Sequence, residues 1–205
     1  MARARNDKHM RRTFALTTTL LCLAGCTAWS RSDPLDDLGP IGDFSLIERS
    51  GRQVTGTDLA GKVWIASFIF TRCNGPCPAV TGTMARLQSD LAGRDGVVLV
   101  TISVDPDHDD PSVLREYADR FGADPERWLF LTGKRAEIYA LCNQGFRVGV
   151  ARDDREETPP GEAVTHSTRL VLVDKTSHKR GYFRGESEDL PRLEEAIATL
   201  LRDSP

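Results

Sequence analysis

The stretch Lys62–Phe70 reads KVWIASFIF, and Thr71–Pro78, which follows it, reads TRCNGPCP. The first stretch is almost entirely apolar, rich in aromatic and β-branched side chains, and too short for a globular helix, so it predicts a buried central strand. Cys73 and Cys77 come directly after this strand, and a helical pattern begins at Pro78, a residue favoured in the first helical turn. We therefore expect both sulfurs at the carboxyl end of a central strand and beside a helix N-terminus.

This position favours chemistry at the two thiols. A helix N-terminus carries partial positive charge, which lowers the pKa of a nearby thiol and favours the thiolate. Two thiolates within reach of each other can close a disulfide or hold a soft metal ion. A purely stabilising disulfide is the alternative, but the loop between Cys73 and Cys77 is short, and short loops gain little from closure. The pair therefore predicts a redox couple or a metal site.

The N-terminus is typical of an export signal. A basic segment precedes an apolar stretch from Thr13 to Leu23 that is too short and too polar to span a membrane permanently. Leu23–Cys26 reads LAGC and resembles a bacterial lipobox, in which the cysteine becomes the lipidated first residue of the mature chain. We expect a lipoprotein-type signal peptide over 1–26, a flexible tether over 27–40, and an exported protein anchored to the membrane through lipid on Cys26, facing the periplasm or cell exterior. Plain signal cleavage is the alternative.

Charge and cysteine content narrow the function further. Residues 27–205 carry 22 basic and 29 acidic side chains, a net charge near −7, so the basic face of a nucleic-acid-binding protein is missing. Cys73, Cys77 and Cys142 remain once the signal peptide and Cys26 are set aside, and an exported compartment is oxidising. Cys142 lies on an apolar helical stripe, so we expect a buried, inert thiol there.

The rest of the chain alternates between strand and helix patterns. Apolar periodicity and turn residues predict a hairpin over 43–55, helices over 78–93, 111–121, 134–143 and 190–201, and strands over 96–104, 128–131, 146–150, 168–174 and 178–184. Residues 151–164 read ARDDREETPPGEAV, a charged insertion that is long for a connection and therefore functional or mobile. This order predicts an α/β domain over 41–205, with helices on both faces of a sheet.

Three short motifs resemble the Sco/SenC family of copper-handling proteins, within the thioredoxin superfamily. They are the Cys-x-x-x-Cys-Pro loop at 73–78, Ser-Val-Asp-Pro at 103–106 followed by Asp109 and Pro111, and Thr165-His166 ahead of a strand that ends Leu-Val-Asp at 172–174. The resemblance covers residues 41–203. It implies a thioredoxin-like three-layer α/β/α fold with an N-terminal hairpin and with the charged insertion before the strand that follows His166.

The resemblance also implies a function and its residues. In that family two cysteines and one histidine bind copper, and the protein assists in building the dinuclear copper centre of cytochrome c oxidase. By position, these ligands fall on Cys73, Cys77 and His166, for Cu(I) or Cu(II), with Cys73–Cys77 also able to form a redox disulfide. The implied partners are the copper-bearing subunit of the oxidase or another copper chaperone, and a thiol-disulfide reductant. Asn-Gly-Pro at 74–76 departs from the family, which usually has Pro-Asp after the first cysteine.

Two other functions remain open. A thiol-disulfide oxidoreductase that keeps target cysteines reduced would be an enzyme and would need neither metal nor His166, whereas a copper chaperone carries its cargo without turnover. A structural lipoprotein domain would show neither copper binding nor a redox couple. Among the other polar residues, Asp105 suits either orienting the site or a loop-capping role. His108 and His178 are expected at the surface.

Overall fold

The structure is a computed structural model and describes residues 35–202. The predicted signal peptide, the lipidation site Cys26 and residues 27–34 of the predicted tether lie outside the described residues. Within 35–202, none of the helices combines the length and the apolar content that crossing a bilayer requires.

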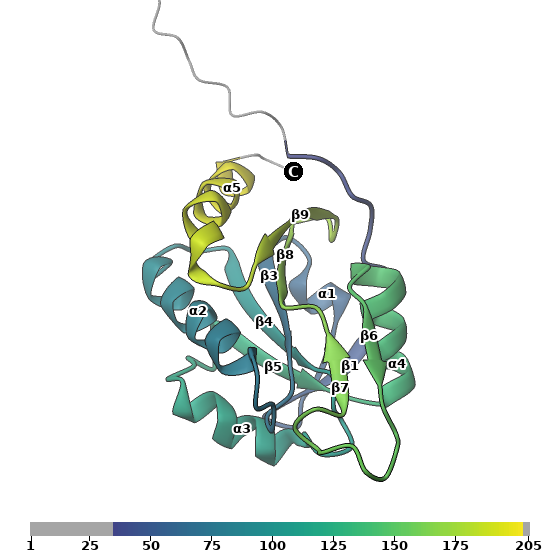
Figure 1. Ribbon diagram of the computed structural model, residues 1–205. Coiled ribbons are helices and arrows are strands. Elements are labelled where there is room, and N and C mark those ends of the chain that lie inside the picture. The colour runs from purple at the N-terminus through teal and green to yellow at the C-terminus, as the bar shows by residue number, and fades with distance from the viewer. Residues whose placement is uncertain (1–34, 203–205) are drawn as a thin grey trace, which may run out of the picture. The chain divides into compact units, whose positions relative to one another are not determined.

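A seven-stranded mixed sheet lies at the centre of the described domain (Figure 1). Its strands, in spatial order, are β2 (Gln53–Thr55), β1 (Ser45–Glu48), β5 (Trp128–Thr132), β4 (Val97–Ser103), β3 (Val63–Ile69), β8 (Arg169–Val173) and β9 (Lys179–Arg184). β3 pairs parallel with β4 and antiparallel with β8, and all seven of its residues are buried. The prediction of a central strand in the KVWIASFIF stretch is confirmed. So is the N-terminal hairpin, which is formed by β1 and β2.

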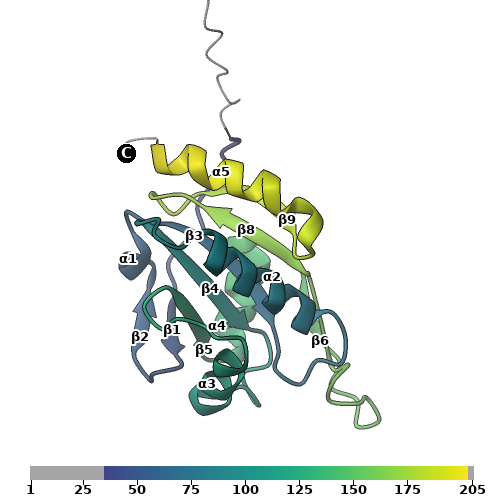
Figure 2. The same ribbon diagram turned by 90° about the vertical axis from the view of Figure 1, so that its left-hand side faces the viewer.

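Helices cover both faces of this sheet. α2 (Cys77–Asp90), α3 (Pro111–Arg120) and α5 (Leu190–Arg202) lie on one side and α4 (Arg135–Ala140) on the other, while α1 (Gly56–Leu59) is a single turn (Figures 1 and 2). Each long helix presents an apolar stripe to the sheet; that of α5 includes the buried Leu193, Ile197 and Leu200. The predicted three-layer α/β/α arrangement is therefore confirmed.

The chain between α4 and the sheet departs from the prediction. The helix predicted over 134–143 is an α-helix only as far as Ala140. The chain then continues as a π-helix, η1 (Leu141–Phe146), which ends at Arg147 in the left-handed conformation, with φ 55°. The wider turn buries the Phe146 ring edge-on against Trp64 and Phe68, with ring centroids 5.8 and 5.0 Å apart. The strand predicted at 146–150 begins later for this reason, as β6 (Val150–Arg152).

β6 and β7 (Val164–His166) form a separate two-stranded antiparallel sheet, in which Val150 lies opposite His166. The charged insertion predicted at 151–164 contributes most of β6, the loop 153–163 and the first residue of β7. We refer to residues 150–166 as the β6–β7 hairpin. His166 is its last residue and lies three positions before β8, so the histidine enters the site from outside the main sheet.

The last residues of the predicted tether are held against the sheet. Leu38 N donates to Lys179 O, Lys179 N donates to Gly39 O, and the buried ammonium of Lys179 donates to the carbonyls of Gly39 and Pro40. Arg180 also donates to the carbonyl of Leu35. Backbone groups of four residues in the predicted tether 27–40 thus have partners on β9: Leu35, Leu38, Gly39 and Pro40.

Candidate dithiol and metal site

The two cysteines lie where the chain passes from β3 to α2. β3 ends at Ile69, and Cys77 is itself the first residue of α2, which puts Pro78 at the second helical position. Cys73 is half-buried and Cys77 is fully buried, and neither sulfur is in a disulfide. Gly75 N donates a hydrogen bond of 3.3 Å to Cys73 Sγ. Both sulfurs therefore lie at the carboxyl end of the central strand, as the sequence indicated.

His166 meets the second cysteine across 89 positions of sequence. Its Nε2 lies 3.3 Å from Cys77 Sγ, and its Nδ1 lies 2.9 Å from the carbonyl oxygen of Ser167. A carbonyl can only accept, so Nδ1 carries the proton and Nε2 presents a free lone pair to Cys77. Phe70 packs edge-on against the imidazole, with ring centroids 5.7 Å apart. The imidazole is thus fixed in the tautomer that a metal ligand requires at Nε2.

Burial decides the protonation of both groups. It lowers the pKa of His166, which keeps the imidazole neutral. It also raises the pKa of Cys77, and the neighbouring Cys73 side chain raises that pKa further. The expectation that the helix N-terminus would lower this thiol's pKa is wrong for Cys77, because the loss of hydration outweighs the helix dipole at a fully buried sulfur. Cys77 is therefore a thiol that donates to Nε2, and this proton would have to leave before the sulfur could bind a metal ion or form a disulfide.

A cavity of about 380 Å³ opens beside these side chains. It is lined by Phe70, by the cysteine loop, Cys73–Pro76, and by Gly161, Glu162 and Val164–His166 of the β6–β7 hairpin. Both Cys73 and His166 face this cavity, whereas Cys77 is not among its lining residues. A ligand or a partner side chain would therefore reach Cys73 and His166 first.

The three predicted ligands are neighbours but not a finished metal site. Within residues 35–202, no group of three or more His, Cys, Asp or Glu side chains is spaced to hold a metal ion. His166 Nε2 contacts Cys77 Sγ, and the neighbouring Cys73 side chain raises the pKa of Cys77. Two sulfurs and one imidazole nitrogen form a donor set that suits copper, so the residues fit the ion once the shared thiol proton leaves.

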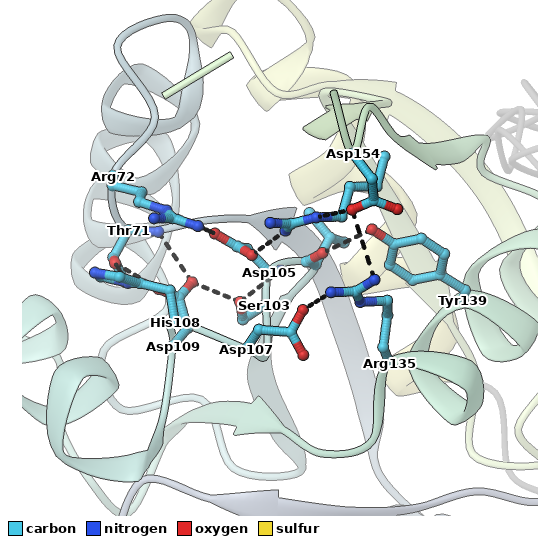
Figure 3. A network of polar contacts seen from close by, with 12 residues as sticks. Thr71, Arg72, Ser103, Asp105, Asp107, His108, Asp109, Arg135, Tyr139 and Asp154 are labelled. Carbon is cyan, nitrogen blue, oxygen red and sulfur yellow. Dashed lines mark hydrogen bonds and ion pairs between the residues drawn. The ribbon is translucent and has the colours of Figure 1, made fainter. Parts of the chain in front are cut away.

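Asp105 lies close to this site, with a partner set that the sequence did not predict. Its carboxylate is fully buried and accepts hydrogen bonds from Arg72, next to Cys73 (Figure 3). It also accepts a hydrogen bond from Arg152, at the end of β6. Asp109, four residues on, is equally buried and is bonded by Thr71 and Ser103. Arg72 and Arg152 have no periodic or motif signal, so only the folded chain reveals their role.

The remaining candidates behave as their sequence surroundings indicated. Cys142 is fully buried, which raises the pKa of its thiol to about 12 and leaves it inert. The His108 side chain is 40% exposed and hydrogen-bonds Asp109. His178 lies between β8 and β9, with its side chain 34% exposed, and pairs with Asp37. None of these three lines the cavity beside Cys73.

A thioredoxin-like domain that carries two free cysteines after its central strand, with a histidine against them, defines a class of dithiol or metal-handling protein. The chain belongs to the SCO1/SenC family, whose model matches residues 35–202. The SCO1 protein homolog of Bacillus subtilis is 32% identical over 156 residues, covering 75% of this chain and 77% of its own.

Solved structures agree with this assignment. BsSco, described as a member of the Sco family of cytochrome c oxidase assembly proteins, is 27% identical, with a TM-score of 0.70 over 84% of this chain and 98% of its own. ScoI of Arabidopsis thaliana, solved with copper bound, is 29% identical, with a TM-score of 0.66 over 78% of this chain and 97% of its own. The resemblance to the Sco/SenC family and the thioredoxin-like fold are therefore confirmed.

Proposed function

We propose that this protein is a copper chaperone of the cell envelope, which binds copper through Cys73, Cys77 and His166 and assists assembly of the dinuclear copper centre of cytochrome c oxidase. The observation that supports this most is the 3.3 Å contact between His166 Nε2 and Cys77 Sγ. A neutral imidazole aimed at a buried thiol beside a second thiol provides soft donors that favour Cu(I). The copper in a solved relative and the oxidase-assembly role of another point the same way.

Delivery follows from the exposure of the site. Cys73 is half-buried and faces the cavity, so an incoming cysteine of a partner protein can reach a copper ion there and take it by ligand exchange. Oxidation of Cys73 and Cys77 to a disulfide would remove two ligands, so the redox state would control copper loading. The protein is then a carrier, tethered to the membrane through lipid on Cys26, and a thiol-disulfide reductant would restore its cysteines.

Copper titration of the reduced full chain, in detergent micelles and against a competing Cu(I) chelator, tests the proposal. We expect one equivalent of Cu(I) to bind, and we expect Cys73→Ala, Cys77→Ala and His166→Ala each to weaken binding. Cys142→Ala and His178→Asn are matched controls, since they remove a thiol and an imidazole away from the cavity. The proposal is contradicted if either control loses copper binding, or if the three site variants bind copper as tightly as the parent.

A thiol-disulfide oxidoreductase is the second candidate, and the free Cys73–Cys77 pair is the observation that favours it. Such an enzyme would exchange disulfides without metal and would keep its activity in His166→Ala. If that variant binds copper as tightly as the parent and exchanges disulfides at the same rate, the oxidoreductase is the better description.

A further inference from the structure

We propose that Arg72 and Arg152, joined through the carboxylate of Asp105, form an ion-pair latch that sets the position of His166 relative to the two cysteines. The proposal rests on the proposed function only in that it treats Cys73, Cys77 and His166 as the ligand set. The latch acts on two segments far apart in sequence, the cysteine loop and the β6–β7 hairpin. Its members are positioning residues that touch no copper ligand through their charged groups.

Asp105 provides the fixed point. It follows β4, a fully buried central strand, and its own side chain is 0% exposed. Arg72 Nε and Nη2 each lie 2.8 Å from Oδ2 of this carboxylate, and Arg152 Nη1 donates to Oδ1. Both carboxylate oxygens are therefore occupied by guanidinium groups, in the charge-assisted geometry that fixes direction as well as distance.

The two arginines belong to the two halves of the candidate site. Arg72 is adjacent to Cys73, so holding its side chain fixes the start of the cysteine loop. Arg152 ends β6, whose pairing with β7 places Val150 opposite His166. The β6–β7 hairpin is not part of the main sheet, so the strand pairing of that sheet does not hold the hairpin in place. Asp105 thus links the hairpin to the cysteine loop through one buried group.

A second contact holds the same two segments together. A Cβ atom on Gly161, in the loop of the hairpin, would lie 2.4 Å from Asn74 Nδ2 and 2.9 Å from the carbonyl oxygen of Arg72. Only glycine allows this approach, because any side chain would displace the loop. The loop of the hairpin therefore lies directly against the cysteine loop at Gly161, and both Gly161 and Asn74 line the cavity.

Arg152 also takes part in an outer group of ion pairs, which is more exposed to solvent than the pairs of Asp105. Arg152 Nε lies 2.8 Å from Asp154 Oδ1, and Arg135 on α4 pairs with both Asp154 and Asp107 (Figure 3). The Arg135 and Asp154 side chains are 39% and 68% exposed, so water screens their pair. The buried pairs of Asp105 therefore dominate, and Arg135 offers a control that breaks only the outer pairs.

Asp105→Asn in the full chain tests the latch, since it keeps the size of the side chain but removes the charge that holds the two arginines. Without copper, we expect amide hydrogen exchange at Val164–His166 to accelerate at least about tenfold, and the NMR shift of His166 Nε2 to move. With copper, we expect Cu(I) affinity to fall at least about tenfold, because the donors are no longer held at one spacing. Arg152→Gln should likewise accelerate hairpin exchange and weaken Cu(I) binding, and Arg152→Lys should show smaller effects on both.

Two matched controls separate positioning from general stability. Asp109→Asn removes an equally buried carboxylate of the same loop, bonded by Thr71 and Ser103 instead of the arginines, and it should lower the melting temperature without accelerating exchange in the hairpin. Arg135→Gln should leave both readouts unchanged. In the Asp105→Asn background, Arg72→Gln should add no further effect, because its action passes through the missing charge.

Each outcome decides the question. If Asp105→Asn lowers the melting temperature as Asp109→Asn does, while hairpin exchange and Cu(I) affinity stay at parental values, Asp105 is a structural residue and the latch is wrong. If the parent chain binds no Cu(I), the proposed function fails, but hairpin exchange and the His166 shift in the metal-free chain still confirm or overturn the latch.

Discussion

Cys73 and Cys77 differ in exposure although only three residues separate them. Cys77 is fully buried with a raised pKa, and Cys73 is half-buried beside the cavity. Because the thiolate is the reactive form, we expect iodoacetamide to modify Cys73 at least about tenfold faster than Cys77 at neutral pH. Mass spectrometry of peptides after timed quenching measures both rates. In denaturant the two rates should converge, and faster modification of Cys77 in the native chain would contradict its assignment as the buried thiol.

His166 should titrate below the value of an exposed histidine. Burial lowers its pKa, so an NMR pH titration of the metal-free chain should give a pKa below about 6.5. The unfolded chain then binds the proton first as pH falls. The free energy of unfolding should therefore drop as pH is lowered below about 6.5 and level off below the native pKa. Urea unfolding of the parent and of His166→Gln measures this, and an identical pH dependence in both would contradict it.

The site residues divide by the kind of signal each leaves in the sequence. Cys73, Cys77 and His166 are found from motifs, because a short spacing and a neighbouring strand mark them. The raised pKa of Cys77 is not predictable in this way, since local reasoning includes the helix N-terminus but not the groups that pack around the sulfur. Arg72 and Arg152 leave no signal either, because an ion pair across 47 or 33 positions has no sequence spacing of its own.

At the scale of elements, two glycines should respond oppositely to the same substitution. Gly185 follows β9, and a Cβ there would lie 2.2 Å from the carbonyl oxygen of Thr168 and 2.9 Å from Val80. Backbone cannot move as a side chain does, so Gly185→Ala should destabilise the fold by about 1–3 kcal/mol. Gly82, exposed within α2, has no atom within 4 Å of a Cβ, and Gly82→Ala should stabilise by about 0.5–1 kcal/mol.

Urea unfolding monitored by circular dichroism compares the two variants with the parent. Equal effects in both, or a gain in stability from Gly185→Ala, would mean that the close approach of Gly185 to Thr168 is not part of the folded chain in solution.

Elements were predictable where a single pattern determines them. The apolar runs at 62–70 and 96–104 fix β3 and β4, and Asp110 caps α3 by accepting from the amides of Ser112 and Val113. The π-helix η1 was not predictable, because the widened turn depends on Phe146 packing against Trp64 and Phe68, contacts that no local period records. The β6–β7 hairpin was missed as a pair of strands for a related reason. Its sequence is charged and does not alternate, so its register depends on the folded domain.

At the scale of the whole molecule, the fold brings the cysteine loop and the hairpin to one edge of the sheet, and copper should bind the folded chain in preference to the unfolded one. The three proposed ligands come from the start of α2, the loop before it and the end of β7, so unfolding separates them. A ligand at 100 times its dissociation constant stabilises the native state by about 2.7 kcal/mol. For a domain of this size, that corresponds to a rise in melting temperature of roughly 5–10 °C.

Thermal unfolding of the reduced full chain, with and without Cu(I), measures this rise. We expect no rise once Cys73 and Cys77 have been oxidised to a disulfide, because two of the three donors are then consumed, and we expect the rise to return after reduction. Cys142→Ala should keep the full rise, since its thiol is buried away from the cavity. An equal rise in the oxidised chain would show that copper binds elsewhere. A rise that depends on reduction in the parent, and that is absent in His166→Ala, would show that the stabilisation depends on Cys73, Cys77 and His166 lying together in the folded chain.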